Sequence, residues 1–188
     1  MDEEKRRIRQ ILAGDTREFQ HLVENYQKLV AHIVFRMIPN ASEREDICQD
    51  IFLKVYQNLS HFRFESKLST WIGRIAYNTC INVLEKKKAV LFDDFAADNQ
   101  SILDYSMPEN SPLKLAEKDD LSVRIQKEIE KIPVHYKTIL TLYHLEEMSY
   151  AEIGEIMNLP EGTVKSYLFR ARKHLRERLL AKYQPEEL

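Results

Sequence analysis

Hydrophobic positions recur at three- and four-residue intervals along most of the chain, which is the period of amphipathic α-helices. In the first half, one such stripe covers residues 19–33 and follows Asp15. We expect Asp15 to cap that helix, because a carboxylate accepts hydrogen bonds from the free N–H groups of the first turn. A second stripe covers residues 47–59, and the spacing of Ser42 and Glu45 predicts a capping box at its start.

A polar and aromatic segment, residues 61–70, separates the second stripe from a long third one over residues 71–84. The third stripe continues into three consecutive lysines. Over residues 89–112 the periodicity fades, and aspartate, asparagine and proline dominate. Shorter helical stripes then cover residues 121–132 and 136–145. We interpret the segment without periodicity as a linker between two groups of helices.

The pattern predicts an all-α protein with two small helical domains, residues 1–88 and 113–188, joined by an acidic linker at 89–112. Only 4 glycines occur among 188 residues, which agrees with helices because strand-and-turn folds usually need more. No apolar run approaches the ~20 residues of a membrane span. The charged first residues lack the apolar core of a signal peptide. We therefore expect a cytoplasmic protein without membrane insertion.

The last forty residues predict a helix-turn-helix. Ser149 and Glu152 have the spacing of a capping box, and Pro160 ends the short helix that follows them. A longer helix from Glu161 carries one apolar stripe, formed by Val164, Leu168, Ala171, Leu175 and Leu179. Residues 161–183 also contain seven Lys or Arg against two Glu. A short helix, a tight turn and a basic helix are typical of proteins that read the DNA major groove.

Charge is segregated along the chain, although the formal net charge is only −2. Residues 62–88 contain six Lys or Arg against two Glu. Residues 91–120 contain eight acids against two lysines. Two basic segments on either side of an acidic one indicate two contacts with a polyanion, joined by a segment that the polyanion repels.

Residues with catalytic or metal-binding potential are scattered rather than grouped. Cys48 and Cys80 lack C-x-x-C spacing, and the six histidines lack the spacing of metal ligands. No glycine-rich phosphate loop follows a strand pattern. We therefore expect no enzyme activity, no cofactor, no metal site and no small-molecule substrate.

Three sequence blocks, taken in their order and spacing, resemble a known family. The blocks are EDICQDIF from Glu45, STWIGRIAYN from Ser69 and GTVKS from Gly162. The first two are similar to region 2, and the third to region 4, of the extracytoplasmic-function (ECF) sigma factors. These are a compact group within the sigma-70 family of bacterial transcription initiation factors. The resemblance covers nearly the whole chain.

The resemblance implies that the first domain reads the promoter −10 element as a melted single strand. It implies a base pocket and a phosphate track formed by Phe62, Phe64, Ser66, Lys67, Ser69, Thr70, Trp71, Arg74, Asn78, Lys86, Lys87 and Lys88. The residue types suit this task, because bases stack on aromatic rings and cations neutralise phosphates. For Phe62, Phe64 and Trp71, packing in the core under the loop is the alternative.

For the second domain, the resemblance implies that the basic helix lies in the major groove of the −35 element. The residues it places there are Glu161, Thr163, Lys165, Ser166, Tyr167, Arg170, Arg172 and Lys173. Among these, Arg172 and Lys173 are either backbone contacts or solvated side chains. Tyr167 departs from the family, because relatives commonly carry arginine at this position. The base preference there is therefore open.

The resemblance also implies protein partners. The helix over residues 45–59 is similar to the part of region 2 that docks on the clamp helices of the largest subunit of core RNA polymerase. The residues on or near its polar face are Asp46, Gln49, Asp50 and Lys54, and a solvated face is the alternative. Phe52, from the apolar side of the helix, completes the set that the resemblance implies for polymerase binding. Further implied partners are the flap of the second-largest subunit, promoter DNA and an anti-sigma factor, which can hold the protein near the membrane.

We therefore interpret the chain as an ECF-type sigma factor. In this role it directs core polymerase to specific promoters, recognises the −35 and −10 elements and promotes DNA melting. A stand-alone helix-turn-helix transcriptional regulator is the alternative, and it would need a dimer surface or a ligand domain. An RNA- or single-strand-binding module is a third possibility, favoured only if the carboxy-terminal half is dispensable.

Overall fold

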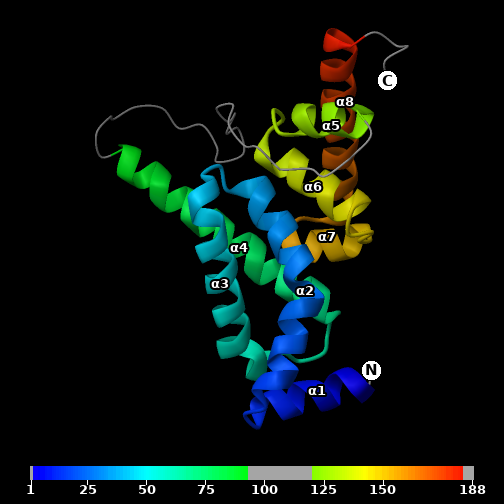
Figure 1. Cartoon of the computed structure of the whole chain (residues 1–188). Helices are drawn as coiled ribbons and strands as arrows, with labels where there is room; N and C mark the ends of the chain where they lie inside the picture. The colour runs from blue at the N-terminus through cyan, green and yellow to red at the C-terminus, as the bar shows by residue number, and fades with distance from the viewer. Residues whose placement is uncertain (1, 93–119, 184–188) are drawn as a thin grey trace. The chain divides into compact units, whose positions relative to one another are not determined.

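The computed structural model describes residues 2–92 and 120–183, and every regular element in them is a helix (Figure 1). The predicted all-α class is therefore confirmed. The elements are α1 (Asp2–Leu12), α2 (Thr16–Met37), α3 (Ala41–Asn58), the short 3-10 helix η1 (Leu59–His61), α4 (Leu68–Phe92), α5 (Asp120–Ile129), α6 (Val134–His144), α7 (Tyr150–Met157) and α8 (Glu161–Lys182). In the described part of the chain, each helix is too short or too polar to cross a membrane.

These helices divide into two compact units, one built mainly from α1 to α4 and the other mainly from α5 to α8. Helix α4 continues to Phe92 and so passes the predicted end of the first domain at residue 88. Residues 93–119 lie outside the described residues. They include most of the predicted linker and the predicted start of the second domain. The domain limits therefore stay a prediction.

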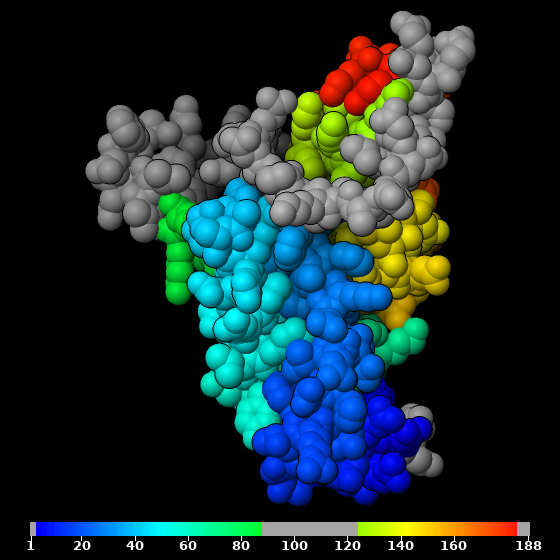
Figure 2. Space-filling model, in the orientation of Figure 1, coloured from blue at the N-terminus to red at the C-terminus, as the bar shows by residue number. Residues whose placement is uncertain are grey.

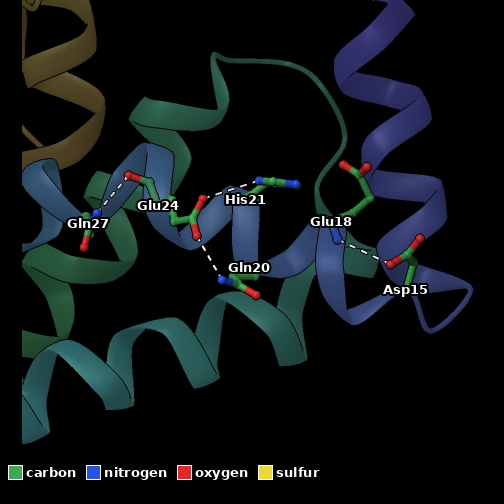
Figure 3. Close-up of polar contacts among 6 residues, drawn as sticks. All are labelled: Asp15, Glu18, Gln20, His21, Glu24 and Gln27. Atoms are coloured by element: carbon green, nitrogen blue, oxygen red, sulfur yellow. Dashed lines mark hydrogen bonds and ion pairs between the residues drawn. The ribbon is translucent and has the colours of Figure 1, made fainter.

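The first unit begins with two helices joined at a capped turn. Gly14, at φ +97°, takes the left-handed conformation that glycine adopts without steric cost. Asp15 then caps α2, because its Oδ1 accepts hydrogen bonds from the backbone N–H groups of Arg17 at 3.0 Å and Glu18 at 3.4 Å. Figure 3 shows the bond from Glu18. The predicted cap is confirmed, and it fixes where α2 starts relative to α1.

The predicted capping box at Ser42 and Glu45 is wrong. Asn40 caps α3 instead, and its Oδ1 accepts from the backbone N–H of Ser42 at 3.2 Å and from the Ser42 hydroxyl at 2.9 Å. Asparagine is among the strongest N-cap residues, so it starts the helix as soon as Pro39 is passed. Arg44, which is buried, stabilises this start by donating to the backbone carbonyl of Ile38 at 2.9 Å.

In the second unit, the helix-turn-helix forms as predicted. The Ser149 hydroxyl accepts from the backbone N–H of Glu152 at 3.3 Å, and the Glu152 carboxylate accepts from the backbone N–H of Ser149 at 2.8 Å. At the other end of α7, Asn158 takes the left-handed conformation at φ +54°. The tight turn needs Gly154, because a Cβ there would lie 2.7 Å from the backbone oxygen of Leu159. This turn sets the direction of α8 relative to α7.

Helix α8 packs on α6 and α5, and part of its predicted apolar stripe is buried. Val164, Leu168 and Ala171 are buried, whereas Leu175 and Leu179 are half-buried. Burial of the stripe turns the remaining faces of α8 outward, and these faces carry its basic residues.

Candidate nucleic-acid interface

In the first unit, three aromatic rings contact one another in tilted pairs, from the core to the surface, at the loop between η1 and α4. Trp71 and Phe62 are buried, with ring centroids 5.3 Å apart. Phe64 follows at 4.7 Å from Phe62 and keeps 36% of its surface exposed. Trp71 and Phe62 therefore pack in the core of this unit, whereas Phe64 presents its ring to solvent.

The backbone of Phe64 is strained. Its φ of +59° lies in the left-handed region, which costs a residue with a Cβ about 1–2 kcal/mol. Residues held in such conformations tend to cluster at functional sites. The ammonium of Lys5, on α1, lies 5.2 Å from the centre of the Phe64 ring. A cation over a ring face at this distance is attracted by the ring quadrupole.

The other predicted −10 residues divide between the loop and α4. Ser66 is half-buried and Lys67 is exposed in the loop. Ser69 and Thr70 belong to the first turn of α4 rather than to the loop, which corrects their predicted position. Thr70 is buried, whereas Ser69 is half-buried. A pocket made of the whole predicted set would therefore combine a loop with the start of a helix.

Along α4, the exposed residues Arg74, Asn78 and Lys86 lie on one ridge of the helix, since they are separated by multiples of four. Asn82 completes this ridge and is also exposed, yet the sequence interpretation omits it. Its spacing of four from Asn78 and Lys86 is the signal that would have found it. Lys87 is half-buried, and the side chain of Lys88 lies outside the described residues.

On α3, the structure brings together part of the set predicted to bind polymerase. Asp46, Gln49 and Asp50 are exposed on one face, and Figure 2 shows α3, in cyan, at the molecular surface. Leu53 continues this face and is 58% exposed, although the sequence interpretation omits it. The spacing of seven residues from Asp46 to Leu53 is the signal that places them together.

The two remaining members of that set lie differently. Phe52 and Lys54 are both half-buried. The ammonium of Lys54 donates to the hydroxyl of Thr79 on α4 at 3.2 Å. Lys54 therefore stabilises the packing of two helices within the unit.

On α8, the outward face collects most of the predicted −35 residues. Lys165, Arg170 and Lys173 are exposed, as are Glu161 and Ser166, and the Ser166 hydroxyl donates to the backbone oxygen of Gly162 at 2.9 Å. Phe169 lies among them, is 70% exposed, and is missing from the predicted set. Its position outside the apolar stripe of the helix is the sequence signal that could have identified it.

Two members of the predicted −35 set differ from that outward group. Thr163 is half-buried. Tyr167 is half-buried as well, and its ring lies 5.3 Å from that of His135 and 5.9 Å from that of Tyr136, both on α6. Packing against α6 therefore takes up part of the Tyr167 ring.

Arg172 is exposed but held by neighbours from α6. Its guanidinium lies 5.1 Å from the centre of the Tyr143 ring, and its Nε donates to Nε2 of His144 at 3.4 Å. Burial and the positive charge of Arg172 both lower the pKa of His144 below its ordinary value. The lowered pKa favours the neutral histidine, which is the form whose Nε2 accepts a hydrogen bond.

The two cysteines are free thiols. Cys80 is buried, and burial raises the pKa of its thiol to about 12. Such a thiol stays protonated at neutral pH and is a poor nucleophile or metal ligand. Among residues 2–92 and 120–183, no three His, Cys, Asp or Glu side chains are grouped so as to hold a metal ion.

Two family descriptions match the two units. The family described as Sigma-70 region 2 matches residues 22–90. The family described as Sigma-70, region 4 matches residues 122–175. These matches define the class of protein: a sigma-70-type initiation factor with a region 2 and a region 4.

Similar proteins show which group of sigma-70-type factors the chain resembles. The ECF RNA polymerase sigma factor SigW of Bacillus subtilis (strain 168) is 37% identical over 183 residues, which cover 93% of this chain and 96% of the relative. The ECF RNA polymerase sigma-E factor of Escherichia coli (strain K12) is 34% identical over 174 residues, 88% of each chain. The sigma factor RpoE of Bartonella quintana, solved in complex with the anti-sigma factor NepR, has the same fold, with a TM-score of 0.69. It is 19% identical, and the match covers 88% of this chain and 99% of that one.

The chain therefore belongs to the ECF sigma factors of the sigma-70 family, and the predicted family is confirmed. It is a promoter-specificity factor for core RNA polymerase in transcription initiation. Sigma factors are initiation factors and are not known as enzymes.

Proposed function

We propose that the first unit binds the −10 element as a single strand, and that α8 of the second unit binds the −35 element as a duplex. The observation that carries the single-strand assignment is the exposed ring of Phe64, which has a positive φ and contacts Phe62, a ring that in turn contacts the buried Trp71. A rigid exposed ring suits stacking of an unpaired base. The ridge of Arg74, Asn78, Asn82 and Lys86 on α4 supports the proposal, because it offers polar and positive groups to the backbone of the same strand.

For the −35 element, the outward face of α8 supports both kinds of contact that groove recognition needs. Exposed cations such as Lys165 and Arg170 suit guanine edges and phosphates. Phe169 adds a large apolar surface among them, and an apolar side chain in the major groove suits the methyl group of thymine. Tyr167 contributes at most the part of its ring that α6 leaves exposed.

We further propose that the α3 face of Asp46, Gln49, Asp50 and Leu53 docks on the clamp helices of core polymerase. An exposed leucine among acidic and amide side chains supports this, since interfaces commonly surround an apolar contact with polar groups. Phe52 borders this face, and Lys54 acts through the packing of α3 on α4. A contact of region 4 with the polymerase flap, an anti-sigma partner and a cytoplasmic location complete the proposal.

Reconstitution with core RNA polymerase tests the function. The full chain and core enzyme are incubated with genomic DNA fragments, and the transcripts are sequenced. We expect start sites that share two elements at fixed spacing, because two modest binding sites held by one enzyme gain selectivity through effective concentration. A chain that bound the same DNA as a dimer without polymerase, and produced no transcripts with it, would instead be a stand-alone regulator.

Replacing Phe64 by glycine should impair promoter melting without unfolding the protein. The stacking platform is lost, which costs about 1–3 kcal/mol per base and slows open-complex formation by about 5- to 150-fold. Glycine also relieves the strain at φ +59°, so the loss of ring packing is offset in part. Permanganate reactivity of −10 thymines measures melting, and Phe64→Tyr, which keeps the ring, is the control. Equal melting by the glycine variant and wild type would exclude the loop from strand separation.

A further inference from the structure

We propose that Tyr143 and Tyr150 are positioning residues that hold Arg172 and Lys165 ready for the phosphates of the −35 duplex. The inference rests on the proposed function of α8 and adds two residues from outside that helix. Tyr143 lies near the end of α6 and Tyr150 is the first residue of α7. Neither contributes a positive charge, so both would act through the cations that they hold.

The two tyrosine rings form one stacked pair, and a cation from α8 lies over each ring. The two tyrosine rings are stacked, with centroids 5.5 Å apart and an interplanar angle of 17°. The guanidinium of Arg172 lies 5.1 Å from the Tyr143 centroid, and the ammonium of Lys165 lies 5.5 Å from the Tyr150 centroid. Tyr143 therefore contacts Arg172, and Tyr150 contacts Lys165, through their ring faces.

The spacing of the two cations also fits a polyanion. Lys165 and Arg172 are seven residues apart, so they lie on the same side of α8, about 10 Å apart along its axis. Both side chains are exposed, so the groups that do not face the rings remain available to a ligand. A guanidinium stacked on a ring still directs N–H donors outward from its edge, in the plane that suits a phosphate. Arg172 is held a second time by His144, which accepts its Nε hydrogen bond.

This pair of rings favours phosphate binding because it lowers the conformational-entropy cost of ordering the two basic side chains. Long basic side chains lose rotamer freedom when a phosphate immobilises them. A ring contact removes part of that freedom before DNA arrives. The number of phosphates neutralised does not change, so the rings should alter the affinity but not its dependence on salt. This separation distinguishes positioning from direct charge neutralisation.

The test uses the full chain and a −35 duplex taken from the promoters found by reconstitution. Fluorescence anisotropy measures the affinity over a series of KCl concentrations. We expect Tyr143→Leu/Tyr150→Leu to bind about 5- to 30-fold more weakly, with an unchanged slope of log K against log[salt]. Tyr143→Phe/Tyr150→Phe, which keeps both rings, should bind within about 2-fold of wild type. Lys165→Ala and Arg172→Ala should each reduce the slope by about 1.

Single variants keep the test valid if the double leucine variant does not fold. Each tyrosine should couple with its own cation, so Tyr143→Leu should add little loss to Arg172→Ala, and Tyr150→Leu should add little to Lys165→Ala. The crossed combinations should be nearly additive. A general loosening of the fold would weaken all four combinations alike and would overturn the proposal.

Three other outcomes would also overturn it. One is unchanged or tighter binding by the leucine variants, since rings that compete with phosphate for the cations would give this result. Another is a reduced salt slope in those variants, and the third is weak binding by the phenylalanine variants. Failure of the proposed function looks different: the wild-type chain with core polymerase would then show no preference for any −35 sequence.

Discussion

The double variant Lys165→Ala/Arg170→Ala is expected to abolish selective recognition of the −35 element while the protein stays folded. Both side chains are exposed on α8, outside the buried stripe of Val164, Leu168 and Ala171, so their removal leaves the core intact. We expect Arg170 to contact a base edge, which contributes about 1–3 kcal/mol, so Arg170→Ala should lose about 5- to 150-fold in affinity. Lys165→Ala removes a phosphate contact and should weaken binding to every −35 sequence. Transcription by reconstituted holoenzyme from promoters with intact and mutated −35 elements measures the effect.

The control for this prediction is Lys127→Ala, which removes an exposed lysine from α5 in the same unit. It changes the net charge as a single variant does but removes nothing from the outward face of α8. We expect promoter selectivity within about 2-fold of wild type. If Lys165→Ala and Arg170→Ala behaved like this control, α8 would not be the groove-binding element.

The second large effect concerns the stability of the second unit. Replacing Glu128 by glutamine is expected to destabilise that unit by about 1–3 kcal/mol. The Glu128 side chain is only 2% exposed and binds two cations of α8, Lys182 at 2.8 Å and Arg178 at 3.2 Å. Lys131 lies 3.6 Å away from the same carboxylate. Glutamine keeps the shape but not the charge, so its amide leaves the three cations without their common partner.

Urea unfolding can show that the destabilisation is confined to the second unit. The chain has 1 tryptophan, Trp71, which lies in the core of the first unit and so reports on that unit by fluorescence. Circular dichroism at a helix wavelength reports on both units. For Glu128→Gln, we expect the transition of the second unit to move to lower urea by roughly 1–3 M, because small units have m-values near 1 kcal/mol/M. The Trp71 transition should stay in place.

The same variant should show a defined pH dependence. Burial alone would raise the pKa of Glu128, but the Lys182 hydrogen bond and the charges of Lys131, Lys182 and Arg178 outweigh it and lower that pKa. A carboxyl with a lowered pKa stabilises the fold fully above its unfolded pKa of about 4.3, and this contribution disappears as the pH falls through the folded pKa. The difference between wild type and Glu128→Gln should therefore be large at pH 7 and shrink in acid.

Glu177→Gln is the matched control for stability. Glu177 forms an exposed ion pair with Lys173 on α8, with 3.7 Å between Nζ and Oε1. Exposed pairs of this kind contribute about 0–1 kcal/mol. Equal destabilisation by the two variants would mean that burial of Glu128 does not strengthen its ion pairs.

Local patterns account for the parts of the fold that were predicted correctly. The caps at Asp15 and at Ser149 with Glu152 form between residues at most three apart, so the chain needs no distant partner to form them. The apolar stripe of α8 likewise follows from the helical period alone. The missed cap at Asn40 belongs to the same local class. There, Asn40 lies two residues before the serine that was predicted to cap the helix, and it starts the helix first.

The candidate interface was predicted only where exposure follows from the helical period. The cations on α8 and the polar residues of α3 fall outside the apolar stripes, so their exposure could be anticipated. Leu53 and Phe169 also lie off the apolar stripes, so the pattern places them toward the surface, but the extent of their exposure depends on neighbouring helices that leave them uncovered. Tyr167 is the converse case, since rings on α6 partly bury a side chain that the helix pattern turns outward.

The sequence by itself determined the helical class, the helix-turn-helix, the basic character of both units and the ECF sigma factor family. These depend on periodicity, on short-range capping and on residue blocks, all of which are properties of neighbouring residues. Only the tertiary structure decided that Phe64 is the exposed ring of its aromatic group, that Glu128 joins α5 to α8, and that Tyr143 and Tyr150 lie under the cations of α8. Each of these contacts joins residues from different helices or turns, and their meeting depends on packing that no local pattern encodes.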